Sequence, residues 1–283
     1  MKAILWPVLA ALSLSACDRS DRITILTGEA MGTTYRIKAV GRVGDVECPI
    51  HQMLKGLDQD LSTWRDDSWV SAFNRAPAGA IMQMPHTVAD LMALSLEYHA
   101  QTDGRFDPTI GALIRVWGFG AWRGEWRGEP TAEEVEAARA ACGFDHLHID
   151  GNSITKRHGG LMLDFSAIAK GYAVDRMSEI LRDAGYENHI IEFGGDVLAS
   201  GHAPGRHGWT VAGPALGEPI TLQNQAIATS GSEHQFRGGR SHVIDPRSGR
   251  PLAVGAPAAA TATTCAGADA LATAKLVSNN RAY

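Results

Sequence analysis

The first part of the chain alternates between apolar and polar residues and then changes to helical spacing. Residues 22–26 (RITIL) and 34–40 (TYRIKAV) alternate at period two around the turn-rich stretch 27–34 (TGEAMGTT), which predicts a β-hairpin. Apolar residues recur at helical spacing over 45–61 and 86–103, which predicts two helices. The chain is therefore expected to open with a hairpin and two helices.

A stretch rich in glycine, tryptophan and arginine follows. Residues 118–130 (GFGAWRGEWRGEP) have no apolar period and predict a long exposed loop that acts as a lid. Glu125 and Glu129 offset the arginines, which disfavours a nucleic-acid surface. Thr131 and Glu134 have the spacing of a capping box and predict a helix that starts at Thr131.

Short alternating segments dominate after residue 144. They are HLHID, LMLDF, HIIEF, DVLASG, WTVAGP, AIATS, SHVIDP and ATATTC. Only residues 168–184 and 266–277 have the pattern of long helices there. Many short strands with a few helices predict an α+β fold, in which a largely antiparallel sheet has flanking helices.

The N-terminus carries a targeting pattern. Met1-Lys2 precede an apolar run that is too short for a membrane-spanning helix and typical of a signal peptide. The run ends in LSAC, which resembles a bacterial lipobox and predicts a signal peptide at 1–16, lipidation of Cys17, a tether at 17–22 and a domain at 23–283. The alternative is a plain secretory signal with a chance cysteine, and either reading predicts export.

Asp18 follows the predicted lipidated cysteine and resembles the signal that retains lipoproteins in the inner membrane. We therefore expect a periplasmic protein with a lipid anchor in that membrane. Three cysteines remain, Cys48, Cys142 and Cys265, and none lies in a CxxC pair. An odd number cannot form a complete disulfide framework, so we expect buried small side chains with at most one disulfide.

Composition narrows the class of protein. The chain is 45% hydrophobic and 20% charged, which is ordinary for a globular protein. The net charge is −5 without a dense cluster of lysine and arginine, so we expect no nucleic-acid partner. The sequence also lacks a GxGxxG fingerprint before a helix, a Walker A motif and a GxSxG elbow.

Residues 163–172 (LDFSAIAKGY) place two opposite charges at a predicted strand-to-helix junction. The apolar run ends in Asp164, and small residues lead to Lys170 and Gly171. The free N–H groups of a helix start, together with the Lys170 ammonium, suit an anionic phosphate. Asp164 is suited to accept a hydrogen bond from a base or ribose, or to lie near a metal ion.

A second candidate site lies in the last predicted helix. Asp269 and Thr273 are four residues apart and share one helix face, where we expect an exposed Asp269. Oxygen ligands without His or Cys suit a hard cation such as Mg²⁺. The alternative is an aspartate favoured by the helix dipole.

Residues 227–249 contribute hydroxyls, a histidine and an acid. They include Ser230, Ser232, His242 and Asp245. His242 is either a structural histidine with satisfied hydrogen bonds or an acid–base group, since hydroxyls and a carboxylate are its neighbours.

Taken together, the segments resemble the ApbE family, the FAD:protein FMN transferases. The matching blocks, in order from residue 31 to residue 274, are MGTTYRI, LSTWRDDSWVSAFN, TDGRFDPTIGALIRVWGFG, LDFSAIAKGYAVD, EFGGDVLASG, IATSGS, SHVIDPRSGRPL and ADALATA. The resemblance implies an ApbE-like, T-fold-related architecture. Family members continue beyond the last block with a helix and a strand, whereas this chain stops at KLVSNNRAY. That element is either dispensable here or lost by truncation.

The resemblance also implies the ligands. FAD would contact Met31, Trp64, Arg105, Phe106, Asp107, Asp164, Lys170 and the stretch His242–Ile244, which includes Val243. Mg²⁺ would lie between the Ala167 carbonyl, Asp269 and Thr273. Some members have a second acid where this chain has Ala272, which predicts weaker metal binding.

The implied reaction is Mg²⁺-dependent transfer of FMN from FAD to a Ser/Thr hydroxyl of a target flavoprotein, with release of AMP. We assign His242 as the group that orients or deprotonates the hydroxyl. The expected acceptor is a flavoprotein subunit of a membrane redox complex. Two alternatives remain: an FAD pyrophosphatase that gives FMN and AMP, and a non-catalytic flavin-binding assembly factor.

Overall fold

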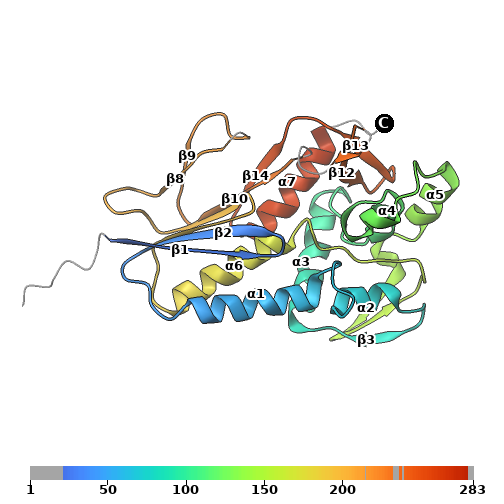
Figure 1. Ribbon diagram of the computed structural model, residues 1–283, viewed down its shortest axis with the longest axis horizontal. Helices are drawn as coiled ribbons and strands as arrows, with labels where there is room; N and C mark the ends of the chain where they lie inside the picture. The colour runs from blue at the N-terminus through green and yellow to red at the C-terminus, as the bar shows by residue number, and fades with distance from the viewer. Residues whose placement is uncertain (1–21, 214, 232–235, 238, 280–283) are drawn as a thin grey trace, which may run out of the picture.

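A six-stranded antiparallel sheet lies at the centre of the computed structural model, which describes residues 22–213, 215–231, 236–237 and 239–279. The strands run in the order β1–β2–β6–β7–β10–β14 (Figure 1). Their bounds are β1 (Ile23–Ala30), β2 (Thr33–Val40), β6 (His189–Phe193), β7 (Asp196–Ser200), β10 (Gln225–Ser230) and β14 (Ala258–Ala262). All neighbouring pairs are antiparallel, so the predicted α+β class is confirmed.

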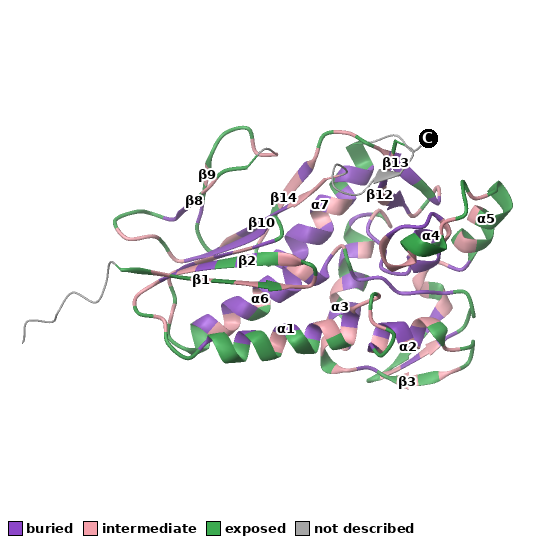
Figure 2. Cartoon of the chain, viewed as in Figure 1, coloured by how far each residue is buried: buried purple, intermediate pink, exposed green. Residues whose placement is uncertain are grey.

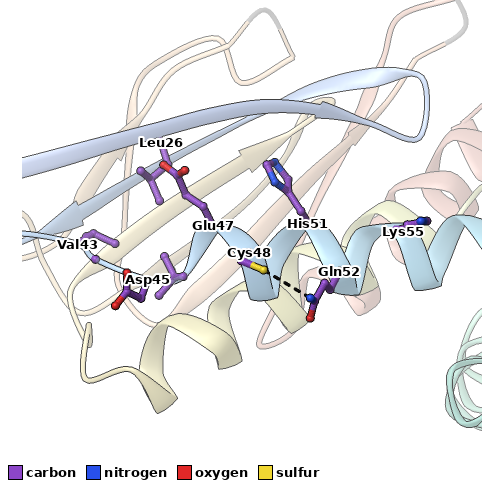
Figure 3. Close-up of a pocket in the computed structure, with 10 residues that line it drawn as sticks. Leu26, Val43, Asp45, Glu47, Cys48, His51, Gln52 and Lys55 are labelled. Carbon is purple, nitrogen blue, oxygen red and sulfur yellow. Dashed lines mark hydrogen bonds between the residues drawn. The ribbon is translucent and has the colours of Figure 1, made fainter.

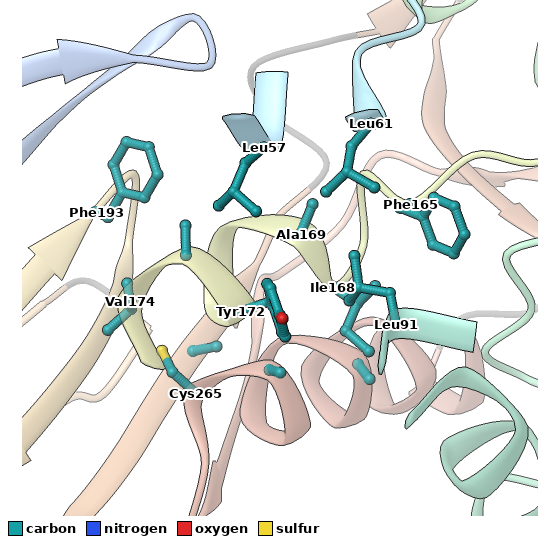
Figure 4. Close-up of a cluster of buried hydrophobic side chains, with 14 of the residues drawn as sticks. Leu57, Leu61, Leu91, Phe165, Ile168, Ala169, Tyr172, Val174, Phe193 and Cys265 are labelled. Atoms are coloured by element: carbon teal, nitrogen blue, oxygen red, sulfur yellow. The ribbon is translucent and has the colours of Figure 1, made fainter. Parts of the chain in front are cut away.

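Helices cover one face of this sheet. They are α1 (Glu47–Leu61), α6 (Ala169–Asp183) and α7 (Cys265–Asn279), and α3 (His86–Gln101) packs against α1 and α7. In α1 the buried residues are Ile50, Leu54, Leu57 and Leu61, and this spacing forms a single apolar stripe. Leu57 and Leu61 meet Ala169 and Tyr172 of α6 in the main core (Figure 4).

The last helix lies deepest in the molecule. In α7 the buried residues include Ala266, Ala268, Ala270, Ala272 and Ala274, and Figure 2 shows that α6 and α7 are largely buried. Alanine side chains allow close approach of a helix to its neighbours, so α7 packs against both α6 and the strands β10 and β14. The close packing of α7 on α6 sets the position of Asp269.

The opposite face of the sheet is covered only in part. A hairpin of β8 (Trp209–Val211) and β9 (Ile220–Leu222) packs Trp209 and Leu222 against Val197, Ala199 and Ile227 of the sheet. Beyond the hairpin this face is polar, and an open groove of about 650 Å³ contains Arg36, Lys38 and Glu192.

Smaller elements surround the main sheet. The helices are α2 (Trp69–Arg75), α4 (Gly111–Val116), α5 (Ala132–Ala140) and the 3-10 turns η1 (Gly120–Glu125) and η2 (Phe144–His146). One small sheet joins β3 (Ile81–Gln83), β5 (Ser153–Lys156) and β4 (Leu147–Asp150), and another joins β11 (Phe236–Arg237), β12 (Arg240–Asp245) and β13 (Arg250–Ala253).

Most local predictions are confirmed. The hairpin forms, with its turn at Met31 and Gly32. The Thr131 side chain caps α5, and Glu134 completes the capping box. The stretch 118–130 lacks strands and α-helices but contains η1. The predicted strand at 161–165 (LMLDF) is wrong, because Met162 makes only an isolated parallel bridge with Ile110.

Predictions about the N-terminus and the cysteines have different outcomes. The predicted signal peptide and Cys17 lie outside the described residues. Among the residues that are described, no helix is long and apolar enough to cross a membrane. Cys48, Cys142 and Cys265 are free thiols. The prediction that they are buried is confirmed for Cys265 and wrong for Cys48, which is exposed in the first turn of α1, while Cys142 is half-buried.

Figure 3 shows the surroundings of Cys48, an open hollow of about 520 Å³ between β1 and α1. The Gln52 amide donates to Cys48 Sγ at 3.5 Å, and His51 is bonded to the Tyr35 hydroxyl. None of the residues that line this hollow belongs to the site that the sequence predicts.

Candidate functional site

The turn before α6 presents the Asp164 carboxylate. Asp164 Oδ1 accepts a hydrogen bond from the Ser166 N–H at 2.8 Å, which is the geometry of an Asx-turn. The Ile168 and Ala169 N–H groups then donate to the Phe165 carbonyl, and α6 starts at Ala169. Asp164 and Lys170 therefore lie on the two sides of one turn, as the sequence predicts.

Lys170 is held by two carboxylates from different elements. Its Nζ lies 2.9 Å from Asp196 Oδ2, at the start of β7, and 3.4 Å from Asp269 Oδ2, on α7. The carboxylates are almost completely buried. Burial lowers the pKa of the Lys170 ammonium, but Asp269 and Asp196 outweigh burial and raise that pKa above its usual value. The two carboxylates thus favour the charged form of the lysine at the start of α6.

Close packing of α6 on α7 brings Asp269 to this lysine. A Cβ on Gly171 would lie 2.3 Å from the Cys265 carbonyl oxygen, so only glycine fits there. The Gly171 N–H donates to Asp269 Oδ2 at 3.3 Å. Asp269 is therefore buried rather than exposed, and the sequence-based expectation about its exposure is wrong.

A carboxylate of α6 fixes the start of α7. Asp175 accepts from the Cys265 N–H at 2.7 Å and from the Ala266 N–H at 2.9 Å, two of the N–H groups that a helix start leaves without partners. Burial raises the pKa of Asp175 to about 6. This bond sets the rotation and height of α7, and with them the position of Asp269 and Thr273.

The metal ligands implied by the resemblance fit one cation in chemical terms. Thr273 Oγ1 lies 2.9 Å from Ser230 Oγ, and Asp269 is one helical turn before it. Asp196 Oδ1 is buried and has no hydrogen-bond partner in the described part of the chain. Such an orphan oxygen is costly, and a cation beside Asp269 would satisfy it.

The described residues contain no group of three or more His, Cys, Asp or Glu side chains that could hold a metal ion. A set made of one carboxylate, a backbone carbonyl and a hydroxyl does not require such a group, and Mg²⁺ accepts it because water and phosphate oxygens complete its shell.

The stretch Arg105–Asp107 lies beside Asp164, because the Asp164 N–H donates to the Pro108 carbonyl at 2.8 Å. Asp107 accepts from the Thr109 N–H and hydroxyl at 2.8 and 2.6 Å. Burial raises the pKa of the Asp107 carboxyl. The Phe106 side chain is buried in the core, so a ligand could meet only the backbone of that residue.

The tip of the β1–β2 hairpin reaches Lys170. Met31 has a positive φ of 47° and packs against the main core. Beside it, a Cβ on Gly194 would lie 2.9 Å from Thr33 and 3.3 Å from Lys170, so the hairpin tip, the β6–β7 turn and α6 meet at one point. Gly194 also has a positive φ of 57°, a conformation that glycine adopts at low cost.

Trp64 is open to solvent. Its side chain is 64% exposed, and the Arg123 guanidinium from η1 lies 5.8 Å from the ring centroid, within cation–π range. An exposed indole is a surface for stacking. Within the described chain, Trp64 and Arg105 make no hydrogen bond, ion pair or ring contact with the Lys170 cluster.

His242 and Val243 lie in an irregular part of β12. The register between β12 and β13 shifts between Arg240 and Ile244, and such bulges reorient side chains. His242 is half-buried, and Val243 packs with Leu276 and Val277 of α7. The neighbour of the candidate catalytic residue thus packs against α7, the helix that carries Asp269 and Thr273. Ser232 lies outside the described residues.

The sequence analysis missed Asp196, and it missed that Asp175 caps α7. Asp196 follows Gly194-Gly195, and an acid directly after two glycines at a strand start is the signal that could have found it. Asp175 follows Lys170 by five residues on the same predicted helix, but nothing local predicts its bond to α7.

These features define an α+β protein in which a half-buried lysine at a helix start is paired with two buried aspartates, a cluster suited to a ligand that carries phosphate. The sequence profile of the ApbE family matches residues 31–282, and the chain belongs to this family. An FAD:protein FMN transferase of Vibrio cholerae is 33% identical over 267 residues, which cover 87% of this chain and 79% of that protein. One from Salmonella typhimurium is 30% identical over 269 residues, 86% of this chain and 77% of that protein.

Solved structures agree with the sequence comparison. The apo form of the flavinyl transferase ApbE from Pseudomonas stutzeri superposes with a TM-score of 0.82 at 36% identity, covering 91% of this chain and 86% of that one. The flavin transferase ApbE from Vibrio cholerae gives a TM-score of 0.79 at 32% identity, with coverage of 90% and 87%. The predicted ApbE-like architecture is therefore confirmed.

Proposed function

We propose that this chain transfers the FMN part of FAD to a Ser/Thr hydroxyl of a target flavoprotein and releases AMP. The observation that carries the proposal is the half-buried Lys170 at the start of α6, paired with the buried carboxylates of Asp196 and Asp269, in a chain whose relatives are named FAD:protein FMN transferases. The cluster combines a fixed positive charge with carboxylates at the place where a pyrophosphate would lie.

The reaction exchanges a phosphoanhydride bond for a phosphoester bond. The acceptor hydroxyl oxygen forms a bond to the phosphorus on the FMN side, the bond from that phosphorus to the bridging oxygen breaks, and AMP leaves with the bridging oxygen. His242 takes or orients the hydroxyl proton. Lys170 holds the negative charge that grows on the pyrophosphate oxygens, and the two carboxylates keep this ammonium charged and in place.

Magnesium is part of the proposal. The Ala167 carbonyl, Asp269 and Thr273 would hold Mg²⁺, and the orphan oxygen of Asp196 supports a cation at this place. When bound, Mg²⁺ would neutralise charge on the pyrophosphate. Ala272 precedes Thr273, so the chain supplies no second acid there, and moderate metal affinity is expected.

Other site residues would bind the rest of FAD. Asp164 and the Arg105–Asp107 stretch lie beside each other and would bind one end of the dinucleotide. Met31 and the exposed Trp64 offer apolar surface for the flavin ring. Val243 lies beside His242 on β12 and would complete the pocket near the reacting phosphorus.

Two other functions use the same pocket, and one assay separates them. Purified chain is incubated with FAD and Mg²⁺, with and without membranes from cells that lack this chain. Covalent flavin on a membrane protein supports the transferase. AMP formed equally without membranes supports an FAD pyrophosphatase, and intact FAD in both samples supports a non-catalytic flavin-binding assembly factor.

The acceptor and the location belong to the same proposal. A flavoprotein subunit of a membrane redox complex is the acceptor, and the chain meets it in the periplasm through a lipid anchor on Cys17 in the inner membrane. An anchor in the same membrane raises the effective concentration of the acceptor. Fractionation of wild type beside Cys17→Ser tests this: soluble wild type, or wild type in the outer membrane, would contradict it.

A further inference from the structure

The extended segment before α6, Leu161–Phe165, is held by side chains as well as by backbone. On one side the Gly111 N–H donates to the Met162 carbonyl at 3.0 Å. On the other side Asn74 of α2 bonds twice to Leu163: its Oδ1 accepts from the Leu163 N–H at 2.7 Å, and its amide donates to the Leu163 carbonyl at 2.9 Å. The Asn74 amide thus replaces a neighbouring strand.

A buried lysine joins Asn74 to the same extended segment. Lys156, at the end of β5, is completely buried, and its Nζ donates to the carbonyls of Phe73 and Asn74 at 3.1 Å and of Leu161 at 3.2 Å. An ammonium has three N–H donors, so all three are used. Two of the acceptors lie in the last turn of α2, the negative end of the helix dipole.

This lysine has an unusual environment for a buried charge. Among the described residues, no carboxylate forms an ion pair with Lys156. Burial lowers the pKa of its ammonium. A buried charge is costly unless hydrogen bonds compensate, and an apolar side chain of similar length would fill the space at lower cost. The charge therefore serves to fix the positions of two backbone segments. It joins the end of α2, at Arg75, to a segment that begins 86 residues later, at Leu161.

The tied segment leads directly to the candidate site. Asp164 follows Leu163, and its carboxylate then forms the turn that opens α6. The cluster around Lys170 is fixed separately, by Asp196, Asp269 and the Asp175 cap on α7. A loosened segment would move Asp164 while leaving the charged cluster in place.

We propose that Lys156 and Asn74 are positioning residues for flavin-nucleotide binding, which act through Leu161 and Leu163 on Asp164. The inference rests on the proposed function, because it takes Asp164 as a contact of FAD. Loss of either residue should raise the KM and the Kd for FAD about tenfold, the effect of one or two lost hydrogen bonds. The rate at saturating FAD should change by less than about threefold, since the reacting centre keeps its own supports.

The test measures FAD affinity by quenching of flavin fluorescence and, in parallel, KM and kcat for Lys156→Met and Asn74→Ala. Arg75→Ala is the matched control: it lies at the same end of α2, but its guanidinium bonds to the Asp66 carbonyl instead of the tied segment. If Lys156→Met does not fold, Asn74→Ala decides alone, since its side chain is only half-buried.

Weaker FAD binding in both variants, with kcat retained and the control unchanged, supports the inference. Folded variants with unchanged FAD affinity, or with kcat reduced in proportion to the unfolded fraction at constant KM, would overturn it. Wild type that binds FAD but transfers no FMN would refute the proposed function alone, because the affinity comparison still stands. Wild type that does not bind FAD would refute both.

Discussion

Two lysines flank Asp164 in the sequence, the buried Lys156 and the half-buried Lys170, and their surroundings differ. Lys170 is paired with two carboxylates, Asp196 and Asp269, which raise its pKa. Within the described chain the Lys156 ammonium donates its hydrogen bonds to backbone carbonyls and lies 5.3 Å from the centroid of the Phe73 ring, and burial lowers its pKa. The first arrangement pairs an ammonium with carboxylates, which keeps it charged. In the second arrangement a buried ammonium holds backbone segments together through hydrogen bonds.

The difference assigns separate roles to two parts of one site. The part around Lys170 is built from α6, α7 and β7, and would act on the pyrophosphate. The part around Lys156 is built from α2 and β5, and would set the position of the nucleotide contact at Asp164. Changes in the first part should therefore reduce the rate, and changes in the second should reduce FAD affinity.

Among substitutions around Lys170, Asp269→Ala should cause the largest loss of transfer rate. The substitution removes both a partner of Lys170 and the proposed carboxylate ligand of Mg²⁺, whose loss is worth several kcal/mol of transition-state stabilisation, or on the order of a thousandfold in rate. FMN transfer at saturating Mg²⁺ measures it. Because Asp269 is buried, thermal unfolding must confirm that the variant is folded. Transfer at the wild-type rate would remove the metal assignment.

Replacing each lysine by methionine compares the two parts of the site directly. Lys170→Met should lower kcat by roughly a hundred- to a thousandfold, the scale for one lost donor to a developing charge. Lys156→Met should instead raise the Kd for FAD. Steady-state kinetics and FAD titration of the two variants side by side measure this. Similar losses of kcat in both would show that the two parts do not have separate roles.

His242→Ala tests the proton-transfer role on the rate side of the comparison. The rate should fall by roughly a hundredfold, the usual scale for a lost acid–base group, with FAD affinity nearly retained. Single-turnover transfer and FAD titration distinguish the two quantities. Equal losses in affinity and turnover would make His242 a residue that positions FAD.

The two lysines should also respond oppositely to alkaline pH. The pKa of Lys170 is raised on folding, so its contribution to stability is present below the ordinary lysine value and falls as pH rises through it and beyond. The pKa of Lys156 is lowered, so the unfolded chain binds more protons below that value and stability rises with pH in that window.

Urea unfolding in metal-free buffer from about pH 8 to about pH 11, around the ordinary lysine pKa of about 10.4, measures this difference. Relative to wild type, Lys170→Met should lose less stability as pH rises, whereas Lys156→Met should lose more. Parallel pH profiles for wild type and both variants would contradict the two assigned environments.

The elements that could be predicted from the sequence depend on neighbours in the chain. The β1–β2 hairpin, α1, α3 and the capping box at Thr131 follow from local periodicity and turn chemistry. Strands of three or four residues, such as β3 and β5, are too short for such patterns, and they were missed. The apolar run LMLDF has the composition of a strand, yet its partners are Pro108, Ile110 and a side-chain amide.

The candidate site divides in the same way. Asp164, Lys170 and Asp269 lie in segments whose local pattern and family resemblance single them out. Asp196 reaches Lys170 over 26 positions, and Asp175 reaches Cys265 over 90. No local pattern encodes bonds of that range, because they depend on how closely α6 and α7 pack at Gly171. Lys156 was missed for the same reason.

The most direct test of transferase activity is the chemical state of the acceptor. Purified wild type, FAD and Mg²⁺ are incubated with membranes from cells that lack this chain, and flavin-bearing proteins are digested and analysed by mass spectrometry. The account predicts a Ser or Thr peptide whose mass has increased by FMN less one water, with one AMP released per modified peptide, and a strong reduction of both in Lys170→Met. Release of AMP without a modified peptide would contradict the account.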